Sequence, residues 1–146
     1  MVRLHRISVA IAVAAMTAIA ARAQSATSVW DGIYTDAQAA RGSAGFGARC
    51  ASCHGATLDG TGEAPALTGA QFLSDFSGLT VGALYDRIRT SMPQDNPGSL
   101  TRDQYADILA FVLQSNAMPS GAKELDRRSE YLKAISFEAA NPHDIR

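Results

Sequence analysis

Cys50-Ala51-Ser52-Cys53-His54 holds both cysteines of the 146-residue chain and one of its three histidines. This C-x-x-C-H spacing is the attachment motif of c-type haem. Two thiols three residues apart can add to the two vinyl groups on neighbouring pyrrole rings, and the next residue then lies below the iron. We therefore predict one covalently bound haem c on Cys50 and Cys53, with His54 as an axial ligand of the iron.

Other uses of paired cysteines fit the sequence less well. A thioredoxin-like C-x-x-C follows a strand and begins a helix, whereas this motif follows a helical pattern. A zinc site needs further Cys or His ligands, and beyond the first 23 residues the chain adds only His143. A structural disulfide would leave His54 unexplained. The motif therefore favours haem.

The first 23 residues have the composition of a secretory signal. Arg3 and Arg6 precede an apolar core over residues 9–20, and Ala21-Arg22-Ala23 then places small residues at the spacing of a signal peptidase site. The core is shorter than the roughly 20 residues of a membrane-spanning helix, so a retained anchor is the less favoured alternative. We expect residues 1–23 to be a cleaved Sec-type signal peptide of a bacterial, periplasmic protein.

Composition narrows the class of partner. Lys and Arg total 13 against 14 Asp and Glu, a formal net charge of -1, and loss of the arginine-bearing signal makes the chain more acidic. The basic surplus of a nucleic-acid binder is therefore missing. Hydrophobic residues at 47% and charged residues at 18% are ordinary globular values. We expect no nucleic-acid partner, and no membrane span after signal cleavage.

Local patterns predict an all-α fold. Thr35 and Gln38 fit a capping box at the start of a helix over residues 36–50. Thr80 opens a second helix, which ends before Met92-Pro93 because a residue before proline is pushed out of the helical region.

A third helix is the clearest of the chain. Thr101 and Gln104 repeat the capping-box pattern, and the helix ends near Asn116. Residues 54–77 show no sustained period and are predicted as loop.

The two ends of the mature chain carry weaker patterns. Residues 24–34 are predicted as an exposed lead-in, and a short helix is predicted over residues 126–134 of the charged tail. Four apolar side chains could fasten that tail to the body: Leu125, Leu132, Ile135 and Phe137.

The second axial ligand has few candidates outside the signal, namely Met92, Met118 and His143. Met92 lies between an amphipathic helix and a turn-rich loop and is followed by Pro93, so the loop can project its thioether across a haem face. Met118 follows the last main helix and is less suited. We predict Met92, and His/Met ligation raises the reduction potential.

Over roughly residues 34–116 the chain resembles a monohaem class I cytochrome c. Gly42 and Phe46 precede the motif where that family has a glycine and an aromatic residue on its N-terminal helix. The resemblance implies a small cytochrome c fold, in which the N- and C-terminal helices cross at this glycine and loops wrap round one covalent haem. The C-terminal helix would present Tyr105 and Ile108 at the crossing.

Further motifs extend the resemblance. Pro65-Ala66-Leu67 stands where the family has Pro-x-Leu. This implies that the Pro65 carbonyl accepts a hydrogen bond from the His54 ring, and that Leu67 packs on the haem. Met-Pro-x-x-x-Pro-Gly-x-Leu over residues 92–100 is similar to bacterial periplasmic cytochromes c associated with quinoprotein dehydrogenases.

The implied role is that of an electron carrier, not an enzyme, which shuttles one electron between redox proteins. Its partners would be a dehydrogenase, an oxidase or another cytochrome, met as a monomer in weak, transient complexes; an electron-transfer subunit of a dehydrogenase is a variant of this role. The domains would be a signal peptide (1–23), a lead-in (24–34), a cytochrome c domain (35–118) and a C-terminal extension (119–146).

Two alternatives stay open. If Met92 does not bind the iron, the chain is an open-site haem protein that binds small gases or peroxide. If the haem is only structural, the charged tail over residues 123–138 is a docking segment of an interaction module. For an electron carrier we expect an apolar haem pocket formed by Phe46, Leu67, Tyr85, Ile88, Tyr105 and Ile108.

Overall fold

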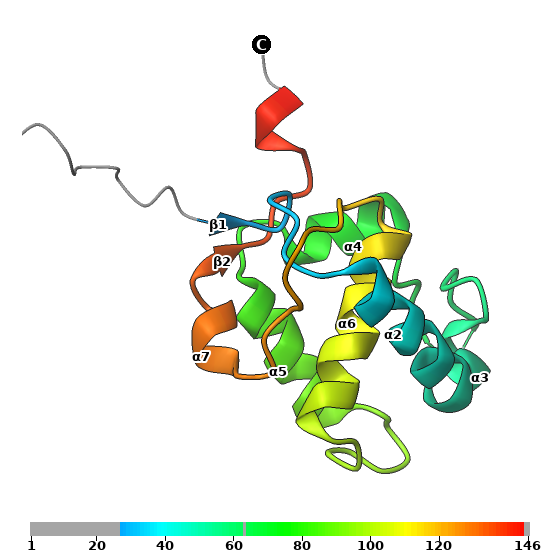
Figure 1. Cartoon of the computed structure of the whole chain (residues 1–146). Coiled ribbons are helices and arrows are strands. Elements are labelled where there is room, and N and C mark those ends of the chain that lie inside the picture. The colour runs from blue at the N-terminus through cyan, green and yellow to red at the C-terminus, as the bar shows by residue number, and fades with distance from the viewer. Residues whose placement is uncertain (1–26, 63, 145–146) are drawn as a thin grey trace, which may run out of the picture.

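The computed structural model describes residues 27–62 and 64–144, so the expected signal peptide lies outside the described residues. The helices are α2 (Asp36–Arg49), α3 (Ala51–His54), α4 (Gly69–Phe76), α5 (Val81–Ser91), α6 (Arg102–Ser115) and α7 (Ser129–Leu132) (Figure 1). Two-residue strands β1 (Thr27–Ser28) and β2 (Ile135–Ser136) and a 3₁₀ turn, η1 (Pro142–Asp144), complete the described part. Apart from the two short strands, the described part is all-α, as predicted. No helix of the described part is long and apolar enough to span a membrane.

Helices α2 and α6 cross in close contact near the centre of the molecule (Figure 1). Gly42 lies at the crossing, where a Cβ atom would stand 2.5 Å from the carbonyl carbon of Asp107 and 3.0 Å from the backbone nitrogen of Ile108. Only a glycine lets the two backbones approach so closely. The predicted crossing at Gly42 is therefore confirmed, with Ile108 at the contact. Tyr105 is buried on the same helix, and its hydroxyl donates to the Met92 carbonyl at 2.7 Å.

The helix starts follow the predicted caps with one exception. Thr101 and Gln104 form the full capping box of α6, and the Thr80 side chain accepts a hydrogen bond at the start of α5. Thr35 accepts from the backbone N–H of Gln38 at 3.1 Å. The Gln38 side chain does not reach back to close the box. It is buried and exchanges two hydrogen bonds with the backbone of Leu125, because the C-terminal segment covers this end of α2.

The prediction of loop throughout residues 54–77 is wrong over α4. This helix is short, and its aromatic side chains pack against the distant C-terminal segment. The Phe72 and Phe76 rings lie 6.2 Å and 6.0 Å from the Phe137 ring. Thr68 and Gln71 have the Thr-x-x-Gln spacing of a helix start, but the packing that stabilises this short helix comes from a residue far along the chain.

The lead-in is not exposed, contrary to the prediction. Val29 and Tyr34 are buried, β1 pairs in parallel with β2, and the indole N–H of Trp30 donates to the Glu138 carbonyl at 2.9 Å. The two ends of the described chain are therefore joined to each other.

The tail is fastened as predicted. Leu125, Leu132 and Phe137 are buried, and Ile135 is half-buried. The helix of the tail, α7, covers only Ser129–Leu132 and is shorter than the predicted helix over residues 126–134.

Candidate haem site

The C-x-x-C-H motif lies where α2 gives way to α3. Cys50 is the residue between the two helices, and Cys53 and His54 form the last turn of α3. Both thiols are free, with Cys50 half-buried and Cys53 exposed. Burial raises the pKa of the Cys50 thiol. Since no disulfide joins them, both sulfur atoms are available for thioether bonds.

His54 is held by its backbone and by its ring. The side chain is 8% exposed, and its Nδ1 atom lies 2.8 Å from the carbonyl oxygen of Pro65. A carbonyl can only accept, so Nδ1 carries the ring proton and Nε2 is left with its lone pair. Among the described residues no hydrogen bond uses Nε2. This is the tautomer that an iron ligand needs, and the carbonyl fixes the orientation of the ring.

A tight loop links His54 to Pro65. The Gly60 N–H donates to the His54 carbonyl at 2.8 Å, and the Leu67 N–H donates to the Leu58 carbonyl at 2.8 Å. Gly60 has φ +78, and a Cβ there would lie 2.6 Å from the backbone nitrogen of Ala66. Only glycine fits at this position, and the Gly60/Gly62 pair in a short loop is the signal of it in the sequence.

Met92 lies at the end of α5. It is half-buried, its N–H closes the last turn of the helix on Ile88, and its carbonyl accepts a hydrogen bond from the Tyr105 hydroxyl at 2.7 Å. The loop that follows is tied to the haem motif, because the Arg49 guanidinium donates to the Ser99 hydroxyl at 3.3 Å.

The competing ligand candidates are engaged elsewhere. Met118 is buried in the hydrophobic core, and its carbonyl accepts from the Tyr34 hydroxyl. His143 is 61% exposed and pairs with Asp31 at 2.9 Å.

The side chains of the expected apolar haem pocket differ in burial. Phe46, Tyr105 and Ile108 are buried, whereas Leu67 and Ile88 are half-buried. Tyr85 departs from the prediction. Its hydroxyl lies 2.9 Å from the Arg127 carbonyl and 3.2 Å from the Arg102 carbonyl, on the side covered by the C-terminal extension.

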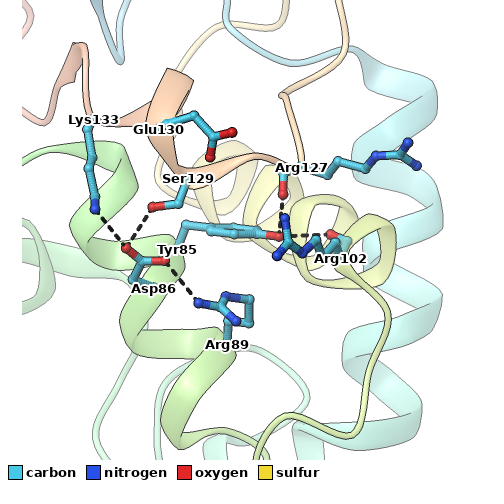
Figure 2. Close-up of a pocket in the computed structure, with 8 residues that line it drawn as sticks. All are labelled: Tyr85, Asp86, Arg89, Arg102, Arg127, Ser129, Glu130 and Lys133. Carbon is cyan, nitrogen blue, oxygen red and sulfur yellow. Dashed lines mark hydrogen bonds and ion pairs between the residues drawn. The ribbon is translucent and has the colours of Figure 1, made fainter.

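Figure 2 shows the polar pocket that Tyr85 borders instead. Its centre is Asp86, which accepts a 2.6 Å hydrogen bond from Ser129 and ion pairs with Lys133 and Arg89 at 3.5 Å. The hydrogen bond from Ser129 is the main cause that lowers the pKa of Asp86. The pocket has a volume of about 240 Å³ and contains neither cysteine nor histidine. It is the seam along which α7 docks on α5, and it is separate from the haem site. The lining residues are Tyr85, Asp86, Arg89, Arg102, Arg127, Ser129, Glu130 and Lys133.

The donor set therefore fits a haem of the c type. The donors are the His54 imidazole, the Met92 thioether and the free thiols of Cys50 and Cys53. The Arg49–Ser99 hydrogen bond joins the segment before the cysteines to the loop that follows Met92. Within residues 27–62 and 64–144 no group of three or more His, Cys, Asp or Glu side chains could hold a metal ion, so the described residues offer no closed zinc site.

Comparison with known proteins agrees with this geometry. Residues 37–112, slightly more than half of the chain, match the family model described as cytochrome c oxidase, cbb3-type, subunit III. A search of curated proteins gave no significant match. The crystal structure of the sulfane dehydrogenase SoxCD from Paracoccus pantotrophus contains a similar chain, with 26% identity and a TM-score of 0.52 over 79% of this chain. The match spans 66% of that SoxCD chain. This chain belongs to the matched family of c-type cytochromes, and it is a monohaem class I cytochrome c with one covalently bound haem c.

Proposed function

We propose that the protein is a periplasmic carrier that shuttles one electron between redox proteins, with His54 and Met92 as the two axial ligands of its iron. The observation that carries this proposal is the 2.8 Å contact between His54 Nδ1 and the Pro65 carbonyl. It holds the ring proton on Nδ1 and leaves Nε2 for the iron. When bound, the haem supplies an iron that changes its charge by one.

The chain's own residues tune this centre and shield it. Pro65 holds the imidazole in one orientation and raises its basicity. The half-buried side chains of Leu67, Ile88 and Leu100 exclude water from the site. With both axial positions filled, no coordination site is left for a substrate, and the function is transfer of an electron through the haem edge.

A dehydrogenase is the proposed electron donor. The support is the similarity to a chain of SoxCD, a sulfane dehydrogenase, together with the 92–100 motif. Because such a carrier must dock and leave quickly, we expect a monomer whose complexes bury less than about 1,200 Å². Export to the periplasm would use residues 1–23 as a cleaved signal.

The test compares two methionines in the purified holoprotein. Leucine is close to methionine in volume, so Met92→Leu and Met118→Leu disturb packing little. We expect Met92→Leu to abolish the weak near-infrared sulfur-to-iron band and to lower the reduction potential in a potentiometric titration. Met118→Leu should spare both. If Met118→Leu removes the band instead, or if neither does, the ligand assignment is wrong.

A haem stain after denaturing electrophoresis tests the covalent link in the same preparation. The wild-type chain should stain and should show the reduced-minus-oxidised spectrum of a low-spin haem c. A high-spin ferric spectrum with ready binding of carbon monoxide would instead support an open-site haem protein.

A further inference from the structure

Helix α6 contacts both of the loops that carry the proposed iron ligands. Near its N-terminus, Tyr105 is 1% exposed and donates its hydroxyl to the Met92 carbonyl at 2.7 Å. The same oxygen lies 3.5 Å from the Leu100 N–H. One buried hydroxyl therefore meets both ends of the loop over residues 92–100.

At the other end of α6, Asn116 holds the loop on the His54 side. Its amide nitrogen donates to the Leu67 carbonyl at 2.9 Å, and its amide oxygen accepts from the Gly69 N–H at 3.2 Å. The same nitrogen donates to Val112 of α6 at 2.8 Å. Asn116 is 8% exposed, so these bonds are largely shielded from water. The segment that contains Pro65 is thereby fixed to the helix.

The two contacts lie on one rigid element. Tyr105 and Asn116 are about 16 Å apart along the helix at about 1.5 Å per residue, and α6 is itself fixed against α2 at Gly42. We infer that α6 sets the relative position of the two axial-ligand loops, with Tyr105 and Asn116 as positioning residues for Met92 and His54. This inference rests on the proposed assignment of those two ligands.

Each contact has its own functional consequence. Without the Tyr105 hydroxyl, the Met92 loop leaves the iron more often, and an external ligand competes better for that position. The net contribution of one hydrogen bond typically corresponds to a change of about threefold to tenfold in an equilibrium constant. Here that constant is the one for replacement of Met92 by the external ligand. Without the Asn116 amide, the Pro65 carbonyl is held less firmly, the imidazole becomes less basic, and the reduced iron is favoured.

The distal contact is tested by cyanide binding to the ferric holoprotein. Tyr105→Phe removes only the hydroxyl, and Tyr85→Phe is a matched control because that buried hydroxyl bonds the Arg102 and Arg127 carbonyls at the tail seam. We expect Tyr105→Phe to raise cyanide affinity about threefold to tenfold and Tyr85→Phe to leave it unchanged. Equal cyanide affinities for the two variants would overturn the role of Tyr105.

The proximal contact is tested by potentiometry and amide hydrogen exchange. Gln38→Ala is the matched control for Asn116→Ala, because Gln38 is also a buried amide that bridges to a distant backbone segment. We expect Asn116→Ala to raise the reduction potential and to speed exchange at Gly69, whereas Gln38→Ala should do neither. If both variants shift the potential equally, Asn116 acts only through stability.

The outcomes separate this inference from the proposed function. If Met92→Leu leaves the sulfur-to-iron band intact, the ligand assignment fails and the inference fails with it. If Met92→Leu removes the band while Tyr105→Phe and Tyr85→Phe bind cyanide equally, the carrier function stands and only the role of α6 is refuted.

Discussion

Three glycines of α2 offer a graded test of how the fold is closed. A Cβ at Gly42 would stand 2.5 Å from the Asp107 carbonyl carbon, which is backbone and cannot turn aside. At Gly45 the nearest atom is a side-chain carbon of Ile108 at 3.3 Å, and at Gly47 nothing lies within 4 Å. The three positions share one helix and differ in what an added methyl group would meet.

The expected magnitudes follow from these distances. Gly42→Ala would force α2 and α6 apart by about 1 Å, and overpacking of this kind costs about 3 kcal/mol or more where backbone must move. Alanine returns about 1 kcal/mol of helix propensity, so we expect a net loss of about 2 kcal/mol. Gly47→Ala gains the propensity with no clash and should stabilise by up to about 1 kcal/mol. Gly45→Ala should fall between them, since the Ile108 side chain can shift.

The assay is guanidinium unfolding of each holoprotein followed by far-ultraviolet circular dichroism. The free energies of unfolding should rank Gly47→Ala above Gly45→Ala, and Gly45→Ala above Gly42→Ala. If Gly42→Ala proves as stable as Gly47→Ala, the helices do not touch at this point and the described crossing is wrong. A Gly42→Ala chain that accumulates no holoprotein while Gly45→Ala does would agree with the predicted ranking.

Replacing Cys50 and Cys53 by alanine should give a chain with no haem stain after denaturing electrophoresis; a stained band would refute thioether attachment. Asp31 accepts a hydrogen bond from a backbone N–H and pairs with His143, and both contacts lower its pKa from the usual aspartate range. Its folded pKa is therefore depressed, so its contribution to stability is present above the ordinary pKa and is lost as the pH falls through the folded one. A carboxyl NMR titration should give a midpoint below that of an ordinary aspartate, and the midpoint should stay depressed in His143→Ala because the backbone bond is the larger cause. Phe137→Ala removes a fully buried ring and should cost about 3–5 kcal/mol in urea unfolding; an unchanged midpoint would show that the tail does not share the core.

Features encoded by neighbouring residues could be predicted from the sequence. The Thr80 and Thr101 caps lie within three residues of the groups they bond, and the end of α5 at Ser91 follows from the proline two residues later. The C-x-x-C-H motif is equally local, because its chemistry needs only the spacing of its own side chains. Covalent haem was therefore predictable before the fold was known.

Features that depend on distant partners were not predictable. The Gln38 side chain had a local use in a capping box, but the structure uses it to bond Leu125, far along the chain. Helix α4 begins at the same Thr-x-x-Gln spacing as two other helices, in Thr68 and Gln71, but Thr68 makes no side-chain cap bond. Its aromatic side chains become interpretable only once Phe137 is placed beside them. Asn116 marks a helix end in the sequence, whereas its bond to the Leu67 carbonyl joins residues that are 49 positions apart.

The placement of the C-terminal extension limits what it can do for a partner. Its apolar side chains are turned inward, with Leu132 and Phe137 at 1% and 0% exposure, and a Cβ on Gly82 would lie 2.6 Å from the Lys133 side chain. Deleting the extension would therefore uncover the core, and a loss of electron transfer in such a truncated chain would not prove docking.

Any docking role is confined to the outward face, where Tyr131 is 54% exposed beneath the Arg128 guanidinium at 4.0 Å. That face lies on α7, whereas the haem motif ends on α3, and the two helices lie on opposite sides of α6 (Figure 1). The buried side chains of Leu132 and Phe137 therefore point to a stabilising role for the extension, and the docking of a partner at the haem edge that we propose would take place away from α7.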